Sequence, residues 1–244
     1  MNKHFSTTGI VIRKTDLNEA DRIITVFTED RGKIDCIAKG ARRFTSKLCG
    51  RLELFNQIKI SCFQGRELAT INEAELINCF SDTQDLKKHR LLFYMAELTN
   101  KLIQHNQHID GAYELITEIL GHTGTSEKLD TLLHSYLIRL LTLTGFLPHW
   151  NRCSKCSITL SLSEPVGMSL NSSPLCPDCS SVSDKRLSPA FIKWVNFMQN
   201  YPLSDALKVK PSEAENGFVW QWLRGILDEL LSGPIKSEEF LERV

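Results

Sequence analysis

Two pairs of cysteines, each separated by two residues, lie in the stretch from 152 to 181. Cys153 and Cys156 form the first pair, and Cys176 and Cys179 form the second. Zn²⁺ is bound by four thiolates on two such tight turns in a closed tetrahedral site, which leaves no coordination position for water or substrate. We therefore predict one structural Zn²⁺ per chain, held in a zinc ribbon over residues 152–182.

Free thiols, an iron cluster and a redox-active dithiol are the alternatives to zinc. A redox dithiol is a single pair at the start of a helix, whereas this stretch holds two pairs in a serine-rich segment. The length of the chain and the paired spacing also favour a metal over disulfides. The metal is therefore expected to stabilise the fold rather than to carry out chemistry.

The first eighty residues follow the two-residue periodicity of short β-strands. Their segments are rich in β-branched residues and are bounded by turn-forming sequences, and Gln64 and Gly65 join the last two as a hairpin. Five short strands with apolar residues on both faces predict a closed barrel, because closure removes exposed strand edges. We predict an OB-type barrel over residues 1–80, with strands at 7–14, 21–28, 32–40, 56–63 and 67–77.

Beyond the barrel, apolar residues recur about every 3.6 positions, as in amphipathic helices. Ser188 as N-cap and a capping box of Ser212 and Glu215 mark two helix starts, and Gly145 marks a helix end. Helices are predicted at 83–105, 110–122, 126–145, 188–200 and 212–231. The predicted fold class is α+β: the barrel, then an all-helical domain over 81–151 and 183–244, with the four-cysteine ribbon inserted at 152–182.

We expect neither a membrane span nor a signal peptide in this sequence. A membrane helix needs roughly 18 uncharged apolar residues, and Arg139 interrupts the best candidate segment. The first residues lack the long apolar run and small-residue cleavage site of a signal peptide. We therefore expect a cytoplasmic protein.

Charge is unevenly distributed along a chain whose formal net charge is zero. Residues 1–80 carry thirteen Lys or Arg against ten Asp or Glu. Between Arg31 and Arg51, seven cations face Asp35 as the single acid, a net charge of +6 in twenty-one residues. Such a local cluster can attract an anionic partner even on a neutral protein.

The segment from 39 to 53 reads KGARRFTSKLCGRLE and combines cations, a glycine and an aromatic residue. A loop of this kind can follow a phosphate backbone and offer a base a stacking surface. The alternatives are a solvated charged loop and, for the aromatic residue, a packing anchor. An OB-type barrel favours binding, because that fold presents a groove for single strands. The candidate nucleic-acid-binding residues are Lys39, Arg42, Arg43, Phe44, Lys47 and Arg51.

No catalytic motif is found in the sequence. There is no GxxxxGK[ST], GxGxxG, GxSxG or HExxH segment, and the seven histidines are dispersed. We therefore predict that the chain is not an enzyme.

Several motifs, in order along the chain, resemble the bacterial DNA repair family RecO. The N-terminal motifs are the glycine-led first strand GIVIRK, the start of the second strand EADRI, the turn TEDRGK and the basic segment AKGARR. The later ones are LLTLTGFLPHWNRCSKC, CPDC, LSPA and the terminal GPIKSEEFL. The resemblance covers nearly the whole chain, and the ordered succession is more specific than any one motif.

The resemblance implies an OB-fold domain, a helical domain with an inserted zinc ribbon, and the function of a recombination mediator. Such a protein binds single- and double-stranded DNA, anneals complementary strands, works with RecR and the single-stranded-DNA-binding protein, and helps to load RecA. It would be nucleoid-associated when engaged on DNA. The AKGARR match carries Lys39, Arg42 and Arg43 over as DNA contacts, Lys47 and Arg51 follow in the same run, and the four cysteines map onto the family's zinc positions.

Arg139 and Tyr136 are the candidate residues for a protein partner. The resemblance implies a single-stranded-DNA-binding protein with an acidic tail that ends in an apolar residue, and such a tail needs an apolar pocket edged by a cation. Arg139 lies three residues after Tyr136 at the edge of an apolar helix face. The alternative is a surface arginine with a local acidic partner.

Two other classes of function stay open at this point. One is a nucleic-acid-modifying enzyme with an unrecognised site, and a catalytic pocket would indicate it. The other is a zinc-ribbon RNA-binding or transcription factor, and a preference for RNA over DNA would indicate it.

Overall fold

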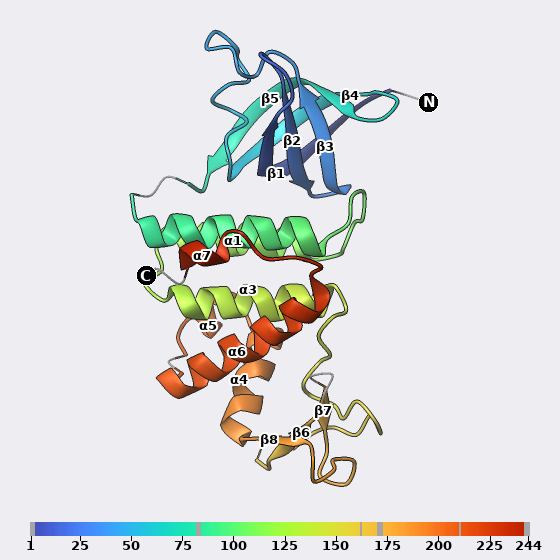
Figure 1. Ribbon diagram of the computed structural model, residues 1–244, viewed down its shortest axis with the longest axis vertical. Helices are drawn as coiled ribbons and strands as arrows, with labels where there is room; N and C mark the ends of the chain where they lie inside the picture. Colours follow the sequence, from blue (N-terminus) through green and yellow to red (C-terminus); the bar gives the residue numbers. More distant parts are fainter. Residues whose placement is uncertain (1–2, 82–83, 162, 170–172, 210, 242–244) are drawn as a thin grey trace. The chain divides into compact units, whose positions relative to one another are not determined.

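The computed structural model describes residues 3–81, 84–161, 163–169, 173–209 and 211–241. The chain divides into two compact units (Figure 1). The first takes in Met1–Glu127 and Pro234–Val244, and the second takes in Lys128–Gly233. The second unit is therefore a continuous stretch of chain, whereas the first is completed by the C-terminal segment.

The N-terminal half of the first unit is a closed five-stranded barrel, drawn in blue to teal in Figure 1. Its strand order is β1-β2-β3-β5-β4, and β1 pairs with β4 to close it. β3 and β5 pair in parallel and the other neighbours are antiparallel. This confirms the predicted OB-type barrel. The strands are β1 (His4–Asp16), β2 (Arg22–Thr28), β3 (Gly32–Ala38), β4 (Asn56–Gln64) and β5 (Ala69–Cys79).

Alternate apolar residues of the strands fill the barrel. Val11, Ile24, Ile58 and others from every strand form one buried cluster. The first strand needs its glycine, because a Cβ at Gly9 would collide with the side chain of Val26 and lie 2.8 Å from the Phe27 carbonyl oxygen. The glycine-led start of the sequence is thus required by close packing between β1 and β2.

The described part of the first unit contains the helices α1 (Leu86–Leu102), α2 (Ala112–Thr123) and α7 (Glu238–Leu241). The predicted helix start at residue 83 lies outside the described residues, and Asp85 caps the observed helix. α1 packs on β1 and α7 packs on α1. The Glu97 carboxylate accepts hydrogen bonds from the backbone N–H groups of Lys236 and Ser237, at 3.0 and 2.9 Å, and from the Ser237 hydroxyl at 2.7 Å. These bonds fix the C-terminal segment to α1.

Within its described residues, the second unit is built on the helices α3 (Leu129–Leu143), α4 (Pro189–Asn200), α5 (Leu203–Ala206) and α6 (Glu213–Leu230). Ser188 caps α4, and Ser212 with Glu215 forms the predicted capping box of α6. α3 ends at Leu143, two residues before the predicted helix end at Gly145, and Gly145 has a φ of +80°. There the N–H of Phe146 bonds the carbonyl of Leu141, which is the six-residue bond of a Schellman motif.

The cysteine stretch forms a small three-stranded sheet within the second unit, in the order β7-β6-β8. Its strands are β6 (Val166–Met168), β7 (Pro174–Leu175) and β8 (Lys185–Leu187). The α+β fold class, with a barrel, a helical region and a cysteine-bearing insert, is therefore confirmed. The sequence-based domain limits, with the barrel at 1–80, the helical domain at 81–151 and 183–244 and the ribbon at 152–182, stay a prediction. None of the helices in the described part of the chain combines the length and apolar character that a bilayer-spanning segment requires.

Candidate nucleic-acid interface and metal centre

Residues 39–55 join β3 to β4 and are here named the basic loop. Apolar side chains fix it to the barrel: Ala41 and Leu52 lie in the barrel core, and Leu48 packs against that core. The backbone runs through consecutive turns, in which the N–H of Arg43 bonds Gly40 and the N–H of Ser46 bonds Arg43. The loop therefore has a fixed apolar side, and its polar side chains point away from the core.

The cations of the basic loop fall into two groups. Lys39, Arg43 and Lys47 are exposed, and among the described residues their side chains have no hydrogen-bond or ion-pair partner. Arg51 instead donates from Nη1 to the carbonyl of Ala74 on β5, at 2.8 Å. Arg42 is also held, by the turn that joins β1 to β2. Three of the five predicted cations are thus unengaged by the described protein.

Arg42 is bound at three points by residues 16–20. Its Nη1 donates to the Asn18 carbonyl at 2.6 Å, its Nη2 lies 3.4 Å from Asp16 Oδ2, and its backbone N–H bonds the Ala20 carbonyl at 3.0 Å. Arg22 donates from Nε to Asp16 Oδ1 at 2.9 Å. This hydrogen bond and then the charge of Arg42 lower the pKa of the Asp16 carboxyl from its ordinary 3.8. The carboxylate therefore stays ionised and anchors both arginines.

The exposed cationic surface is smaller than the count of seven cations between residues 31 and 51 suggests. Lys33 is only 4% exposed, and its Nζ donates to the carbonyl of Asn100 at 2.5 Å. Burial lowers the pKa of its amino group, and the nearby Asp35 carboxylate opposes that effect. Arg31 pairs with Asp30 at 3.4 Å and lies over the Phe5 ring. Lys33 therefore links the barrel to α1 and is not available to a ligand.

Phe44 is the most exposed aromatic side chain among the described residues, at 100%. Because the N–H of Ser46 bonds the carbonyl of Arg43, Phe44 and Thr45 occupy the two central positions of a turn. The ring therefore projects into solvent between cations, and it does not act as a packing anchor within the described protein.

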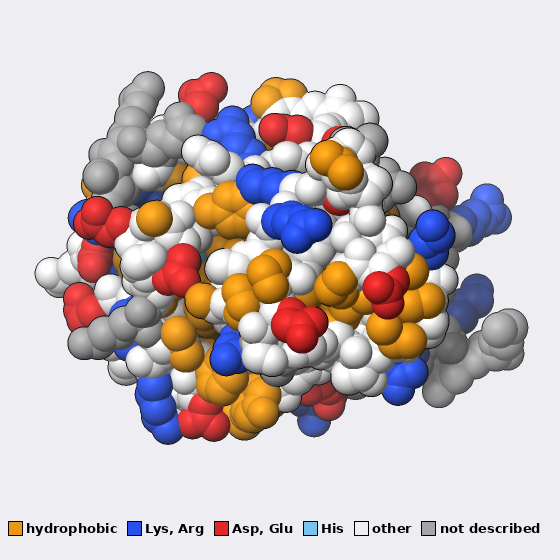
Figure 2. All heavy atoms as spheres, turned by 90° about the horizontal axis from the view of Figure 1, so that it is seen from below, with side chains coloured by type: hydrophobic (Ala, Val, Ile, Leu, Met, Phe, Trp, Pro, Cys, Tyr) orange, Lys and Arg blue, Asp and Glu red, His pale blue; other side chains and the backbone are white. Residues whose placement is uncertain are grey.

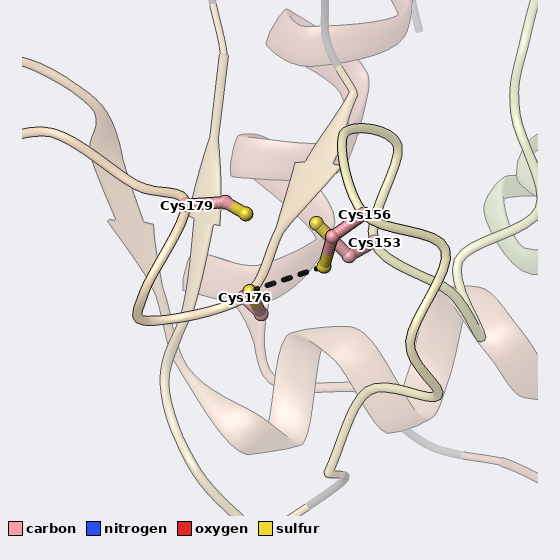
Figure 3. A group of neighbouring side chains, drawn as sticks. All are labelled: Cys153, Cys156, Cys176 and Cys179. Carbon is pink, nitrogen blue, oxygen red and sulfur yellow. Dashed lines mark hydrogen bonds between the residues drawn. The ribbon is translucent and has the colours of Figure 1, made fainter.

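The four predicted metal ligands converge in the second unit (Figure 3). Their sulfur atoms all lie within 4.8 Å of one another, and the Sγ atoms of Cys156 and Cys176 are 3.7 Å apart. A tetrahedral ion with bonds of about 2.3 Å places its sulfur ligands about 3.8 Å apart. The four thiols, Cys153, Cys156, Cys176 and Cys179, could thus hold one metal ion.

Two tight backbone turns present these thiols. In the first, the N–H of Ser157 bonds the Cys153 carbonyl at 2.8 Å, and Ser157 adopts a φ of +62°. In the second, the N–H of Cys179 bonds the Cys176 carbonyl at 3.1 Å. The N–H of Ser154 bonds the Pro174 carbonyl at 2.9 Å and so joins the first turn to β7, the strand that precedes the second turn. The arrangement is therefore fixed by backbone hydrogen bonds as well as by the thiols.

The ionisation of the four thiols is strongly uneven. Burial acts to raise the pKa of Cys153, but backbone N–H groups, first that of Cys176, outweigh it and lower the value to about 6. Hydrogen bonds with Cys176 and Cys156 raise the pKa of Cys179 to about 12. Four thiolates this close repel one another unless a cation lies between them. The donor set therefore fits a thiophilic cation.

The two candidate partner-binding residues lie on α3. Tyr136 is fully buried at 0% exposure. Arg139 donates from Nε to the carbonyl of Met198 at 2.8 Å and from Nη2 to that of Tyr201 at 2.5 Å, both at the C-terminal end of α4. The structure therefore places Arg139 as a cap for α4 and leaves Tyr136 no exposed surface. The acidic-tail site stays a prediction.

The face shown in Figure 2 carries cationic, anionic and apolar side chains interspersed with one another. Among the described side chains visible there, no field of a single charge is formed. That face therefore offers no second cationic patch among its described side chains.

The fold and the site define an OB-type barrel protein with a helical unit and a four-cysteine cluster. Residues 1–80 match the family described as Recombination protein O N terminal, and residues 83–239 match Recombination protein O C terminal. The chain belongs to the RecO family, whose role lies in DNA repair and recombination.

Curated relatives in several bacteria carry the name DNA repair protein RecO. That of Roseiflexus sp. (strain RS-1) is 28% identical over 243 residues, covering 98% of this chain and 86% of the relative. That of Acetivibrio thermocellus is 29% identical over 246 residues, with coverage of 99% and 92%. That of Syntrophotalea carbinolica is 30% identical over 255 residues, with coverage of 98% and 94%. The similarity thus extends over both units.

Proposed function

We propose that this protein is a non-enzymatic recombination mediator that binds single- and double-stranded DNA through the basic loop and anneals complementary strands. The observation that carries the proposal is the exposure of Lys39, Arg43 and Lys47 on one loop without partners among the described residues. Annealing requires a surface that neutralises the phosphates of two strands while base edges stay free to pair. Unpaired cations on an ordered loop meet that requirement.

The proposal includes partners that the family resemblance implies. The protein would act with RecR and with the tail of the single-stranded-DNA-binding protein, and it would help to load RecA onto coated DNA. It would do so on the nucleoid, where this DNA lies. Annealing of complementary oligonucleotides, measured with and without the single-stranded-DNA-binding protein, tests this part: a mediator anneals coated strands, whereas a simple DNA-binding protein is inhibited by the coat.

A salt titration with fluorescent single-stranded DNA tests the binding site. If three to five cations reach phosphates, the logarithm of affinity falls with the logarithm of salt concentration at a slope of about −2 to −3.5. Replacing Arg43 and Lys47 together by alanine removes two contacts and reduces the slope by about 1.4. Lys155→Ala, an exposed lysine of the cysteine insert, serves as the control and should change little.

The opposite result would relocate the interface. If the loop variant binds and anneals normally while Lys155→Ala loses both activities, the cysteine insert is the DNA-binding element. A competition titration with RNA of the same sequence covers the remaining alternative. Stronger binding to RNA than to DNA would favour an RNA-binding or transcription factor.

We further propose that the four cysteines bind one structural Zn²⁺ per chain. When bound, zinc would cross-link the two turns. With four thiolates as ligands, it would have no open coordination position for a substrate. Elemental analysis of the purified protein should find one zinc per chain. Cys153→Ser should lower the zinc content and the thermal midpoint together, because the binding free energy of such a site is folding free energy. Iron, or no metal, would contradict the proposal.

A further inference from the structure

The apolar residues of the basic loop have opposite environments. Ala41, Leu48 and Leu52 face the barrel core, whereas Phe44 is fully exposed at the centre of a turn. Other exposed aromatic side chains of the described protein reach at most 53%. A phenyl ring without protein neighbours contributes no burial to folding, so its apolar faces remain available to a ligand.

Charge beside the ring favours one class of ligand. Arg43 precedes Phe44 directly, and Lys47 lies in the next turn, where the N–H of Cys49 bonds the Ser46 carbonyl. Both cations are exposed and without partners among the described residues. An aromatic ring flanked by free cations suits a nucleic-acid strand whose bases are unpaired, because stacking uses the ring and phosphates use the charges.

We propose that Phe44 stacks on an unpaired base and makes the basic loop select single strands over duplex. In a duplex, both faces of each base are covered by neighbours, so the ring gains a stacking partner only on a single strand. The inference rests on the proposed DNA binding and extends it to the release of the annealed product. Once two strands have paired, the ring loses its base while the phosphate contacts persist, so the duplex product is held less tightly than the substrate.

The same geometry assigns Arg42 a different role from Arg43. Arg42 is bound to the Asn18 carbonyl and to Asp16, whereas Arg43 is not engaged by any described side chain. Arg42 is therefore a positioning residue, which holds the loop against the β1–β2 turn, and Arg43 is the phosphate contact. The two adjacent arginines thus provide matched variants of equal charge change.

The experiment compares Phe44→Ala, Phe44→Trp, Arg42→Ala and Arg43→Ala by titration of three fluorescent DNA probes. The probes are a mixed-sequence single strand, a blunt-ended two-strand duplex of the same sequence, and an abasic strand with the same number of phosphates as the single strand. Phe44→Ala should weaken single-strand binding about tenfold and leave duplex binding and the salt slope unchanged. Phe44→Trp should restore or strengthen the single-strand affinity.

The abasic strand tests stacking on the wild-type protein, so this part of the test does not depend on whether a variant folds. Wild type should bind it about tenfold more weakly than the normal strand, and Phe44→Ala should bind both alike. Arg43→Ala should weaken binding to all three probes and reduce the salt slope by about 0.7 on the two single strands and about 0.9 on the duplex. Arg42→Ala should lower the thermal midpoint and change the slope by less than Arg43→Ala does.

The outcomes separate this inference from the proposed function. If Arg43→Ala weakens binding but Phe44→Ala leaves single-strand affinity unchanged, the loop binds DNA without stacking and the inference on Phe44 is overturned. Equal losses on single strand and duplex for Phe44→Ala would overturn the strand selectivity. If neither Arg43→Ala nor Phe44→Ala affects any probe, the proposed DNA site itself has failed.

Discussion

The buried histidine of the second unit should make the stability of that unit depend on pH. His134 on α3 is 3% exposed, and its ring meets Trp194 edge-on at a centroid distance of 5.8 Å. Among the described residues, its Nδ1 has no hydrogen-bond partner. Burial lowers the pKa of this imidazole from 6.5 to about 4, and the charge of Asp130 only partly opposes the effect. The folded unit therefore holds His134 neutral where the unfolded chain would protonate it.

The sign and size of the effect follow from these two values. Between about pH 6.5 and pH 4 the unfolded state binds more protons than the folded state, so stability is lost as the pH falls. A pKa lowered from 6.5 to about 4 corresponds to about 3 kcal/mol in total, of which about 2 kcal/mol is lost between pH 8 and pH 5. Well above pH 6.5 His134 is neutral in both states, and its contribution to the free energy of unfolding is fully present.

Urea unfolding followed by tryptophan fluorescence measures this loss. All four tryptophans lie between residues 150 and 222, so the signal reports the second unit alone. His134→Phe keeps an aromatic ring against Trp194 and removes the titrating group, so the variant should lose about 2 kcal/mol less than wild type between about pH 8 and pH 5. His149→Phe, an exposed position in the same unit, is the control.

The comparison of wild type with His134→Phe cancels groups that titrate in both proteins, including the cysteines. If the two proteins lose stability equally over this pH range, His134 does not resist protonation in the folded state. The argument from its burial would then be refuted.

Two further predictions concern hydrogen bonds that fix chain segments. Glu97→Gln should weaken the attachment of the C-terminal segment at Ser237 and reduce the free energy of unfolding by about 2 kcal/mol. Calorimetry should show this as a lower midpoint of the first unit, and an unchanged midpoint would contradict the prediction. Glu73→Gln, at an exposed position on β5, is the control. Arg139→Met should cost about 1–3 kcal/mol, because two carbonyls at the end of α4 lose a charged donor. Unchanged stability with lost binding of an acidic tail peptide would instead favour a partner site at Arg139.

Local patterns were sufficient to predict most of the fold. The β-branched segments gave all five barrel strands to within three residues at either end. Ser188, Ser212 and Gly145 act through hydrogen bonds to residues at most five positions away, so sequence spacing alone identifies them. The four-residue helices α5 and α7 were not predicted, because one turn is too short to show a periodicity.

The candidate site was predictable in its residue types and not in its contacts. Lys33 is buried because the carbonyl of Asn100, sixty-seven residues later, accepts its hydrogen bond. Arg42 is engaged by Asn18, twenty-four residues earlier. Nothing in the local sequence distinguishes these cations from Arg43, because the distinction arises from long-range packing. The cysteines differ, since the CxxC spacing itself dictates the turns that bring the thiols together.

The bond between Glu97 and Ser237 has a consequence for synthesis of the chain. These residues are 140 positions apart, and the ribosome adds roughly 5 to 20 residues per second. The barrel and α1 therefore emerge roughly 7 to 30 seconds before the segment that α1 binds through Glu97. During that interval the Glu97 carboxylate accepts hydrogen bonds from water, and the surface of α1 that α7 later covers is exposed to solvent. The first unit is thus the first to begin folding and the last to finish, and its final bonds form only after the whole second unit has been translated.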